Sequence, residues 1–343
     1  MNETSINNAK IRGIIGLQKE IADIQTAIAG FESGRNLNIA IVSEPFCGKT
    51  TLINEIERIN FQKATRISFA SIVKNKSELF PPDDSKRIVI LDHCDMLYMR
   101  KIGGFEILGE FLKQAVSSNK MLITAWNLYS WNFLDEVINL SKFFPVRISL
   151  PKLNPGELKE VILSKYEENE IKFTEDFSFE KEKLVEFRKY PVTLLKKPVN
   201  IPYIKINKIA LKMNMFPKEE TITVEDVVFY KIYQISKGNP GVAEVLWNKS
   251  LEYPVIRQSR IKDFSFRIEL DINEAFILDI ILSTKSITKY ELAEISGPEF
   301  IIDNILFRLE DQGLITIKER LCTINPEALY SIVDYLKKSR LVW

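Results

Sequence analysis

Residues 38–56 read NIAIVSEPFCGKTTLINEI, and this stretch decides the fold. The apolar run Ile39–Val42 is short, as expected for a buried strand. The residues after it include Pro45 and Gly48, which interrupt regular structure. Apolar residues then recur at helical spacing. The stretch therefore predicts a strand, a tight loop and a helix, in that order.

The loop 43–50, SEPFCGKT, matches the phosphate-binding pattern GxxxxGK[ST] except at its first position, where Ser43 replaces glycine. In that pattern, backbone N–H groups at the helix N-terminus face phosphate oxygens, and the lysine places a positive charge near the β- and γ-phosphates. The threonine hydroxyl can coordinate Mg²⁺. The sequence predicts an ATP or ADP site made by Ser43, Glu44, Pro45, Phe46, Cys47, Gly48, Lys49, Thr50 and Thr51.

A second motif, RIVILDH, occupies residues 87–93. Four apolar residues ending in Asp92 describe a buried strand with a carboxylate at its carboxyl end, where open α/β sheets bind ligands. We expect Asp92 and Thr50 to hold Mg²⁺. In active ATPases of this type the next residue is usually an acid that polarises the attacking water, but here it is His93. His93 is a candidate base; the alternative is a histidine without a catalytic part.

Two further polar residues are candidates for the same site. Asp95 is a nearby carboxylate that could replace the missing acid. Asn127 follows the apolar strand 120–126 and is a candidate catalytic residue that reaches the γ-phosphate or its attacking water. The alternative for Asn127 is the N-cap of a helix.

Short apolar strands alternate with amphipathic helices on both sides of these motifs. Strands are expected near 64–70, 87–92, 120–126 and 146–150 as well as at 38–43, and helices at 17–31, 51–59 and 105–116. This alternation is typical of a parallel α/β sheet. We assign residues 1–150 to a P-loop nucleotide-binding domain of the α/β class.

The pattern changes at Pro151 to mainly helical spacing. Asn154 is a predicted N-cap, with Pro155 at the first helical position. Residues 181–218 hold ten lysines and arginines against two acids, a local charge of +8, and four prolines predict that part of them is irregular. A linker is expected at 252–264. We assign residues 151–264 to an α-helical lid with this basic segment and linker.

The last part of the chain, residues 265–343, is predicted to be a winged helix-turn-helix. Helical spacing at 273–282, 288–296 and 298–313 precedes two short strands at 314–317 and 320–324 and a final helix. This arrangement suggests DNA binding. However, residues 271–343 hold eight basic against twelve acidic residues, and phosphate contacts need cations. Contact with a protein is therefore the alternative.

Composition excludes several classes of protein. The chain has 343 residues and a net charge of +1, so its overall charge does not indicate a nucleic-acid or membrane partner. Its only histidine, His93, excludes histidine triads and multi-histidine metal sites. Three scattered cysteines without a CxxC predict reduced thiols and a cytoplasmic location. We expect no signal peptide, and no apolar run is long enough for a membrane span.

The loop 43–50, Asp92 and Asn127 together resemble the motifs of the AAA+ superfamily and its signalling branch, the STAND ATPases. Residues 14–24, IIGLQKEIADI, look like the AAA+ segment ahead of the P-loop, which implies that Ile15 and Gly16 lie near adenine. Residues 236–247, SKGNPGVAEVLW, resemble the lid segment that carries sensor 2 in AAA+ proteins or a Gly-x-Pro in STAND proteins. That resemblance implies that Pro240 contacts nucleotide.

The sequence departs from the AAA+ pattern where hydrolysis is concerned. His93 replaces the acid, and Gly241 occupies the place where a sensor-2 arginine is expected. No arginine is an obvious finger, although Arg100 and Arg147 are candidates. Loss of an arginine finger alone costs about 10³- to 10⁵-fold in rate. We therefore expect ATP binding with slow or absent hydrolysis.

Three functions are consistent with these motifs. The first is a nucleotide-switched regulatory or assembly ATPase of AAA+/STAND type. The second is a DNA-binding initiator or transposition-type ATPase that contacts DNA through residues 181–218 and the winged helix. The third is a nucleotide-stabilised structural subunit of a complex. A protein partner or self-assembly is expected, and sequence alone does not identify the partner.

Overall fold

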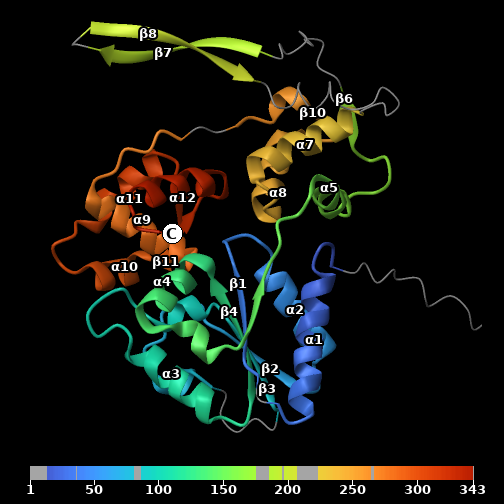
Figure 1. Ribbon diagram of the computed structural model, residues 1–343, viewed down its shortest axis with the longest axis vertical. Helices are drawn as coiled ribbons and strands as arrows, with labels where there is room; N and C mark the ends of the chain where they lie inside the picture. The colour runs from blue at the N-terminus through green and yellow to red at the C-terminus, as the bar shows by residue number, and fades with distance from the viewer. Residues whose placement is uncertain are drawn as a thin grey trace, which may run out of the picture.

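The computed structural model describes residues 14–35, 37–80, 86–174, 185–194, 197–206, 223–263 and 266–342. Figure 1 shows an α/β body with two further groups of elements above one end of its sheet. We call residues 14–149 the α/β body, residues 151–263 the middle segment and residues 266–342 the C-terminal unit. The way these three parts meet at the end of the sheet positions the candidate site.

The α/β body contains a five-stranded parallel sheet with the order β2-β3-β4-β1-β5. Its strands are β1 (Ile39–Ser43), β2 (Ala64–Ser68), β3 (Ile88–Asp92), β4 (Met121–Asn127) and β5 (Val146–Ser149). Every residue of β1, β3 and β4 is buried, which explains why these strands read as continuous apolar runs. The predicted parallel α/β sheet is confirmed.

Helices cover both faces of this sheet (Figure 1). Helices α1 (Gln18–Glu32) and α2 (Lys49–Ile59) pack on one face against alternate residues such as Ile39, Ile90 and Ile123. Helices α3 (Glu106–Ser117) and α4 (Leu128–Ile138) belong to the core of the opposite face, with Val42, Leu91 and Leu122. The alternation arises because successive strand residues point to opposite faces.

The carboxyl ends of β3, β4 and β1 are adjacent, since the three strands are neighbours and run in the same direction. These ends carry Asp92, Asn127 and Ser43, respectively. The chain leaves β1 through α2 toward β2, at one edge of the sheet, and leaves the neighbouring strand β4 through α4 toward β5, at the other edge. Ligands of open α/β sheets bind at such a point.

The middle segment contains helices α5 (Pro155–Leu163), α7 (Val224–Ser236) and α8 (Pro240–Ser250) around an apolar core. Phe229 and Trp247 stack in that core with ring centroids 5.3 Å apart. Asn154 caps α5 as predicted, in a reciprocal arrangement with Glu157. Three short strands complete the segment: β6 (Lys172–Thr174), β9 (Leu251–Glu252) and β10 (Val255–Arg257).

Two predictions for the middle segment are wrong. The expected linker 252–264 instead contributes β10, which pairs with β6 and β9 because Ile256 is buried in the core of the segment. Residues 185–206, expected within a mainly helical and partly irregular region, form an antiparallel hairpin of β7 (Val185–Leu194) and β8 (Lys197–Ile206). Their β-branched and aromatic residues favour strands, and a two-stranded ribbon tolerates proline because each strand has a free edge.

The C-terminal unit has the predicted order of helices and strands, with one strand added. It consists of α9 (Ile272–Thr284), β11 (Ser286–Thr288), α10 (Lys289–Ser296), α11 (Ile302–Asp311), β12 (Ile315–Lys318), β13 (Leu321–Ile324) and α12 (Leu329–Lys338). The extra strand, β11, pairs with β13 to give the sheet order β11-β13-β12. Thr288 caps α10 as predicted.

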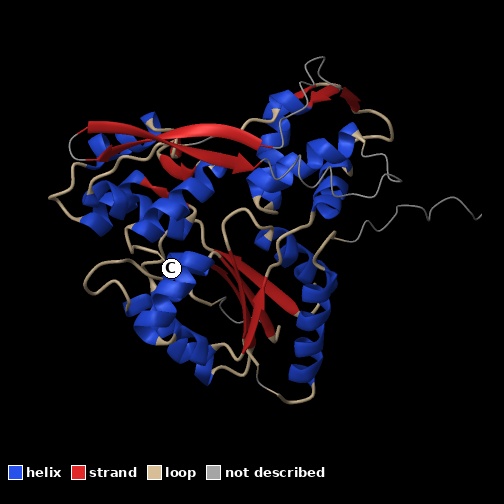
Figure 2. Cartoon of the chain, turned by 45° about the horizontal axis from the view of Figure 1, so that its top comes forward, coloured by secondary structure: helices blue, strands red, loops and turns tan. Residues whose placement is uncertain are grey.

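Helix α9 joins the C-terminal unit to the α/β body. It is mainly apolar and mostly buried, and its apolar residues share one continuous core with α3 and α4. Figure 2 shows the helices of the C-terminal unit and of the middle segment above the sheet, with the β7–β8 hairpin as a separate ribbon. Within the described ranges, no helix is long and apolar enough to cross a membrane.

Candidate functional site

The loop between β1 and α2 has the backbone that a phosphate loop requires. Gly48 has a φ of 91° and Phe46 a φ of 66°, both in the left-handed region. The chain turns sharply there, so that the N-terminus of α2 faces the end of the sheet. Free N–H groups at a helix N-terminus attract anions.

The side chain of Lys49 folds over this loop. Its Nζ donates hydrogen bonds to the carbonyl O of Ser43 at 2.8 Å, to Ser43 Oγ at 3.1 Å and to the carbonyl O of Glu44 at 3.1 Å. Burial lowers the pKa of Lys49 to about 8, while Asp95 opposes the shift. The amine therefore stays largely protonated at neutral pH, and its charge lies at the loop.

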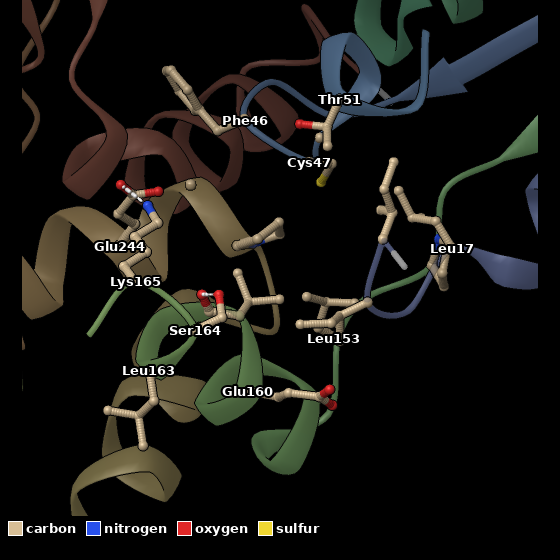
Figure 3. Close-up of a pocket in the computed structure, with 17 residues that line it drawn as sticks. Leu17, Phe46, Cys47, Thr51, Leu153, Glu160, Leu163, Ser164, Lys165 and Glu244 are labelled. Atoms are coloured by element: carbon tan, nitrogen blue, oxygen red, sulfur yellow. Dashed lines mark hydrogen bonds and ion pairs between the residues drawn. The ribbon is translucent and has the colours of Figure 1, made fainter. Parts of the chain in front are cut away.

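Two cavities adjoin the loop and share Phe46, Cys47 and Gly48 as lining residues. The larger has a volume of about 950 Å³ and lies between the loop and the middle segment (Figure 3). The smaller has a volume of about 160 Å³ and lies on the other side, toward the C-terminal unit. Three residues of one loop thus separate a large cavity from a small one.

The larger cavity is mostly apolar, with a few polar groups among its lining residues. Its apolar lining includes Ile15, Leu17, Leu153, Val161 and Pro240. Figure 3 shows Cys47 and Thr51 on one side, facing Leu153 and Ser164 on the other, with the ion pair of Lys165 and Glu244 further along. Apolar walls with a few polar groups are typical of small-molecule sites.

Gly16 shapes this cavity without lining it. It has a φ of 75°, and a Cβ built there would lie 2.4 Å from Leu153 Cδ2. Glycine at position 16 therefore allows the turn that contains Ile15 to approach Leu153 closely.

The smaller cavity is lined by charged and polar side chains from the α/β body and the C-terminal unit. Its lining comprises Lys49, Thr50, Asp92, His93, Asp95, Asn127, Thr284 and Lys285, in addition to the three shared loop residues. Because Thr50 and Asp92 both line it, one hydroxyl and one carboxylate are available there for a hard cation. Mg²⁺ typically takes one or two protein oxygens and completes its shell with phosphate and water, so these residues fit it.

Asp92 and His93 are held by local contacts. Asp92 accepts a hydrogen bond from the backbone N–H of His93 at 3.0 Å and forms an ion pair with Arg66 at 2.8 Å. His93 has a φ of 59°, a left-handed conformation that histidine seldom adopts. The histidine assigned as a candidate base thus lies beside the carboxylate assigned to Mg²⁺.

Asp95 lines the same cavity as Lys49, Thr50 and Asp92. Its carboxylate is buried, lines the smaller cavity and accepts a hydrogen bond from the backbone N–H of Asn127 at 3.2 Å. Burial raises the pKa of Asp95, while His93 and Lys49 oppose the shift.

Asn127 lines the same cavity, but its amide is used in contacts within the protein. Its Oδ1 accepts a hydrogen bond from the backbone N–H of Tyr129 and so caps α4, while its Nδ2 donates to the carbonyl O of Leu282 at 2.8 Å. Both polar atoms are engaged in this arrangement. A catalytic part for Asn127 stays a prediction.

The middle segment is bonded directly to the loop through the N-terminus of α8. Asn239 Nδ2 donates to the carbonyl O of Pro45 at 2.9 Å, and the backbone N–H of Gly241 donates to the carbonyl O of Phe46 at 3.1 Å. A Cβ at position 241 would lie 2.7 Å from Phe46 Cβ. The place where a sensor-2 arginine was expected therefore has no room for a side chain in this arrangement.

Neither arginine proposed as a finger reaches the smaller cavity. Arg100 forms a buried ion pair with Asp279 of α9, donates to Ser283 Oγ at 3.2 Å and stacks 4.0 Å from the Phe133 ring centroid. Arg147 lies 5.5 Å from the Trp131 ring centroid. Arg100 joins the C-terminal unit to the α/β body instead.

Sequence reasoning missed Asn239, Thr284 and Lys285. The Asn-Pro pair at 239–240 is a recognisable N-cap signal for α8. Nothing in the local sequence marks Thr284 and Lys285, because they reach the loop only when the C-terminal unit packs on the α/β body.

The structure thus contains a parallel five-stranded sheet with the loop 43–50 after β1, the strand between β4 and β5. Solved structures of AAA+ P-loop ATPases resemble the chain over most of its length. The Holliday junction branch migration motor RuvB from Thermotoga maritima is 12% identical, with a TM-score of 0.44, over 93% of this chain and 95% of that chain. Cdc6p from Pyrobaculum aerophilum is 11% identical, with a TM-score of 0.41, over 96% of each chain.

The protein Hsp104 is 12% identical, with a TM-score of 0.42, over 96% of this chain and 49% of that chain. No protein-family model and no curated protein matches the sequence. Similarity at these sequence identities and TM-scores does not indicate the activity of this chain.

Proposed function

We propose that this chain is an ATP-binding protein of AAA+/STAND type in which bound nucleotide sets the arrangement of three domains. These are a P-loop domain at 1–150, a lid at 151–264 and a winged helix at 265–343. The observation that carries the proposal is the pair of cavities on either side of Phe46, Cys47 and Gly48. One cavity suits a base and a sugar, and the other suits phosphates.

The chemistry of the two cavities matches the two halves of ATP. Adenine and ribose would occupy the larger cavity between Ile15 and Pro240, where apolar side chains exclude water from a flat base. The phosphates would pass along Gly48 into the smaller cavity toward Lys49, with Mg²⁺ at Thr50 and Asp92. Bound Mg²⁺ would neutralise part of the phosphate charge.

A nucleotide switch is supported by the way all three parts of the chain contact the loop. Glu44 forms an ion pair with Lys152 of the middle segment and accepts a hydrogen bond from Tyr330 of α12 at 3.2 Å. Asn239 and Gly241 bind the loop from α8. A ligand that moves this loop would change its contacts with the middle segment and with the C-terminal unit. A ligand shifts an equilibrium between two arrangements only if it interacts differently with each of them.

Slow or absent hydrolysis is supported by the groups that surround the phosphate cavity. The residue after Asp92 is a histidine, the amide of Asn127 is engaged, and Arg100 is buried in an internal ion pair. An acid or an arginine finger supplied by a partner remains compatible with this arrangement. We therefore propose that ATP binding, more than ATP hydrolysis, sets the arrangement of the three domains.

The test is equilibrium binding of nucleotide to protein shown to be free of it. We expect ATP with Mg²⁺ to bind and to raise the free energy of unfolding by about 2.7 kcal/mol at 100 times its Kd. Chelation of Mg²⁺ should weaken the binding. Calorimetry and thermal denaturation measure both effects. Protein that neither binds ATP nor gains stability from it would overturn the proposal.

A second candidate function, DNA binding, is favoured by the β7–β8 hairpin. Two-stranded ribbons fit the DNA major groove, and these strands contain Arg188, Lys189, Lys197 and Lys205 against a single acid, Glu186. If each cation neutralises one phosphate, affinity for duplex DNA should fall about 100-fold between 50 and 200 mM salt. Fluorescence anisotropy at several salt concentrations measures the slope. Binding that is absent at 50 mM salt, or that Arg188→Gln and Lys189→Gln leave unchanged, contradicts this function.

A further inference from the structure

The corner between α9 and β11 brings the C-terminal unit into the phosphate cavity. Thr284 ends α9, and Lys285 is the single residue between that helix and β11. Both residues line the smaller cavity together with Gly48, Lys49 and Asp92. The cavity therefore has a wall that the P-loop domain does not supply.

Hydrogen bonds from two directions hold this corner in place. From the α/β body, Asn127 Nδ2 donates to the carbonyl O of Leu282 and Ser130 Oγ donates to that of Ser283, each at 2.8 Å. From the C-terminal unit, the backbone N–H of Ile324 donates to the carbonyl O of Lys285 at 3.2 Å. Lys285 also has a φ of 67°, in the left-handed region. Such backbone strain persists only where the surroundings impose it, and it clusters at functional sites.

The charge of Lys285 lies beside the loop, over the ring of Phe46. Among the residues that the structure describes, no carboxylate lies within ion-pair distance of its ammonium group, which is 5.2 Å from the Phe46 ring centroid. It is near enough to Lys49 to contribute to lowering the pKa of that lysine. Two ammonium groups therefore line the same small cavity as the carboxylates of Asp92 and Asp95. A phosphate in that cavity would be attracted by both ammonium groups.

The position of Lys285 distinguishes among the phosphates of a nucleotide. The larger cavity, on one side of Phe46 and Gly48, takes the base and sugar in the function proposed above. Lys285 lies on the opposite side, in the cavity that also contains Asp92 and Asn127 at the ends of β3 and β4. A chain of phosphates that enters past Gly48 would present its last member there.

We infer that Lys285 binds the terminal phosphate of ATP from within the same chain, so that the C-terminal unit itself distinguishes ATP from ADP. This inference rests on the proposed nucleotide site. With ATP bound, Lys285 ties the C-terminal unit to the loop through a charge-assisted hydrogen bond. With ADP bound, that bond is missing, while the other contacts of the unit, such as Arg100 with Asp279 and Tyr330 with Glu44, remain.

The experiment compares Lys285→Met, which keeps the aliphatic stem over Phe46 and removes the charge, with Lys285→Arg, which keeps the charge. The control is Lys289→Met, because Lys289 lies on α10 in the same unit, pairs with Asp303 and does not line the cavity. Calorimetry measures the Kd of each protein for Mg²⁺–ATPγS and for ADP. Hydrogen exchange of residues 280–288 with each nucleotide reports on the corner.

We expect Lys285→Met to weaken ATPγS binding about 10- to 100-fold, as loss of one charge-assisted hydrogen bond implies, and to leave ADP binding within about twofold. Lys285→Arg should retain most of the preference for ATPγS, and Lys289→Met should behave as wild type. ATPγS should slow exchange at 280–288 in wild type but not in Lys285→Met.

Other outcomes separate this inference from the proposed function. Wild type that binds both nucleotides, with Lys285→Met unchanged, overturns the role of Lys285 and leaves the nucleotide site standing. An equal loss of both nucleotides in Lys285→Met places the lysine on an inner phosphate and overturns the discrimination. Wild type that binds neither nucleotide overturns both the site and the inference.

Discussion

Replacing Lys49 by alanine is expected to weaken ATP binding about 10²- to 10⁴-fold. Each hydrogen bond from a charged group contributes about 1.5–3 kcal/mol, and a P-loop lysine contacts two phosphates. Every 1.4 kcal/mol changes the affinity tenfold. Lys49 is the first residue of α2 and the only lysine among residues 43–50. Calorimetric titration of Mg²⁺–ATP into wild type and Lys49→Ala measures the difference.

The control for Lys49→Ala is Lys113→Ala, on the exposed side of α3, where Lys113 pairs only with Glu110. Lys113→Ala should bind ATP as wild type does. Since Lys49 holds two loop carbonyls, thermal denaturation without nucleotide must show that the variant is still folded. A folded Lys49→Ala protein with an affinity within threefold of wild type contradicts the proposed phosphate site.

Replacing Arg100 by alanine is expected to lower the free energy of unfolding by about 3–5 kcal/mol. The side chain of Asp279 is 1% exposed, and Arg100 is its ion-pair partner across the contact between α9 and the α/β body. Removal of the arginine leaves a buried carboxylate without compensation, which costs far more than losing an exposed pair. Urea denaturation measures the change, and limited proteolysis shows whether the C-terminal unit separates first.

The loss in Arg100→Ala should depend on pH. Burial raises the pKa of Asp279 to about 6, with Arg100 opposing the shift, so removal of Arg100 raises it further. A folded-state pKa above the unfolded value means that the folded state binds more protons, and stability falls as pH rises through that interval. Arg100→Ala should therefore be less destabilised at pH 5 than at pH 8.

Two further variants test the cause. Arg267→Ala removes an arginine whose side chain is 90% exposed and paired with the exposed Glu269, so it should change stability by less than about 0.5 kcal/mol. Substituting both Arg100 and Asp279 by methionine should recover most of the loss, because an apolar pair needs no charge compensation. A double variant as unstable as Arg100→Ala would show that packing of Arg100 on Phe133, and not its charge, matters.

Sequence patterns predicted most of the α/β body because its signals are local. Each of the strands from β1 to β5 was expected within a few residues. The signal was clearest for β1, β3 and β4, because burial on both faces forces an apolar run. The loop 43–50 followed from residue types that only a sharp turn before a helix needs. The β7–β8 hairpin was not predicted, because its charged residues and prolines interrupt the apolar pattern that indicates a strand.

The candidate site was predicted only on the side of the P-loop domain. Gly48 immediately precedes α2, Lys49 and Thr50 begin it, and Asp92 ends β3. The positions of these four residues are therefore consequences of local structure. The surroundings of Asn127 and Arg100 were not predictable in this way. Their partners, Leu282 and Asp279, come from α9 and meet them only through long-range packing.

By itself, the sequence determined that a glycine, a lysine and a carboxylate would gather at the carboxyl end of a parallel sheet, because adjacent short-range signals dictate strand, turn and helix. Only the tertiary structure decided which other groups face them. Packing of the mainly apolar helix α9 against α4 brings Lys285 to the loop 43–50, and packing of α8 against Phe46 removes the space for a side chain at Gly241. Burial of apolar surface drives both contacts, and it is non-directional, so no local pattern records where they form.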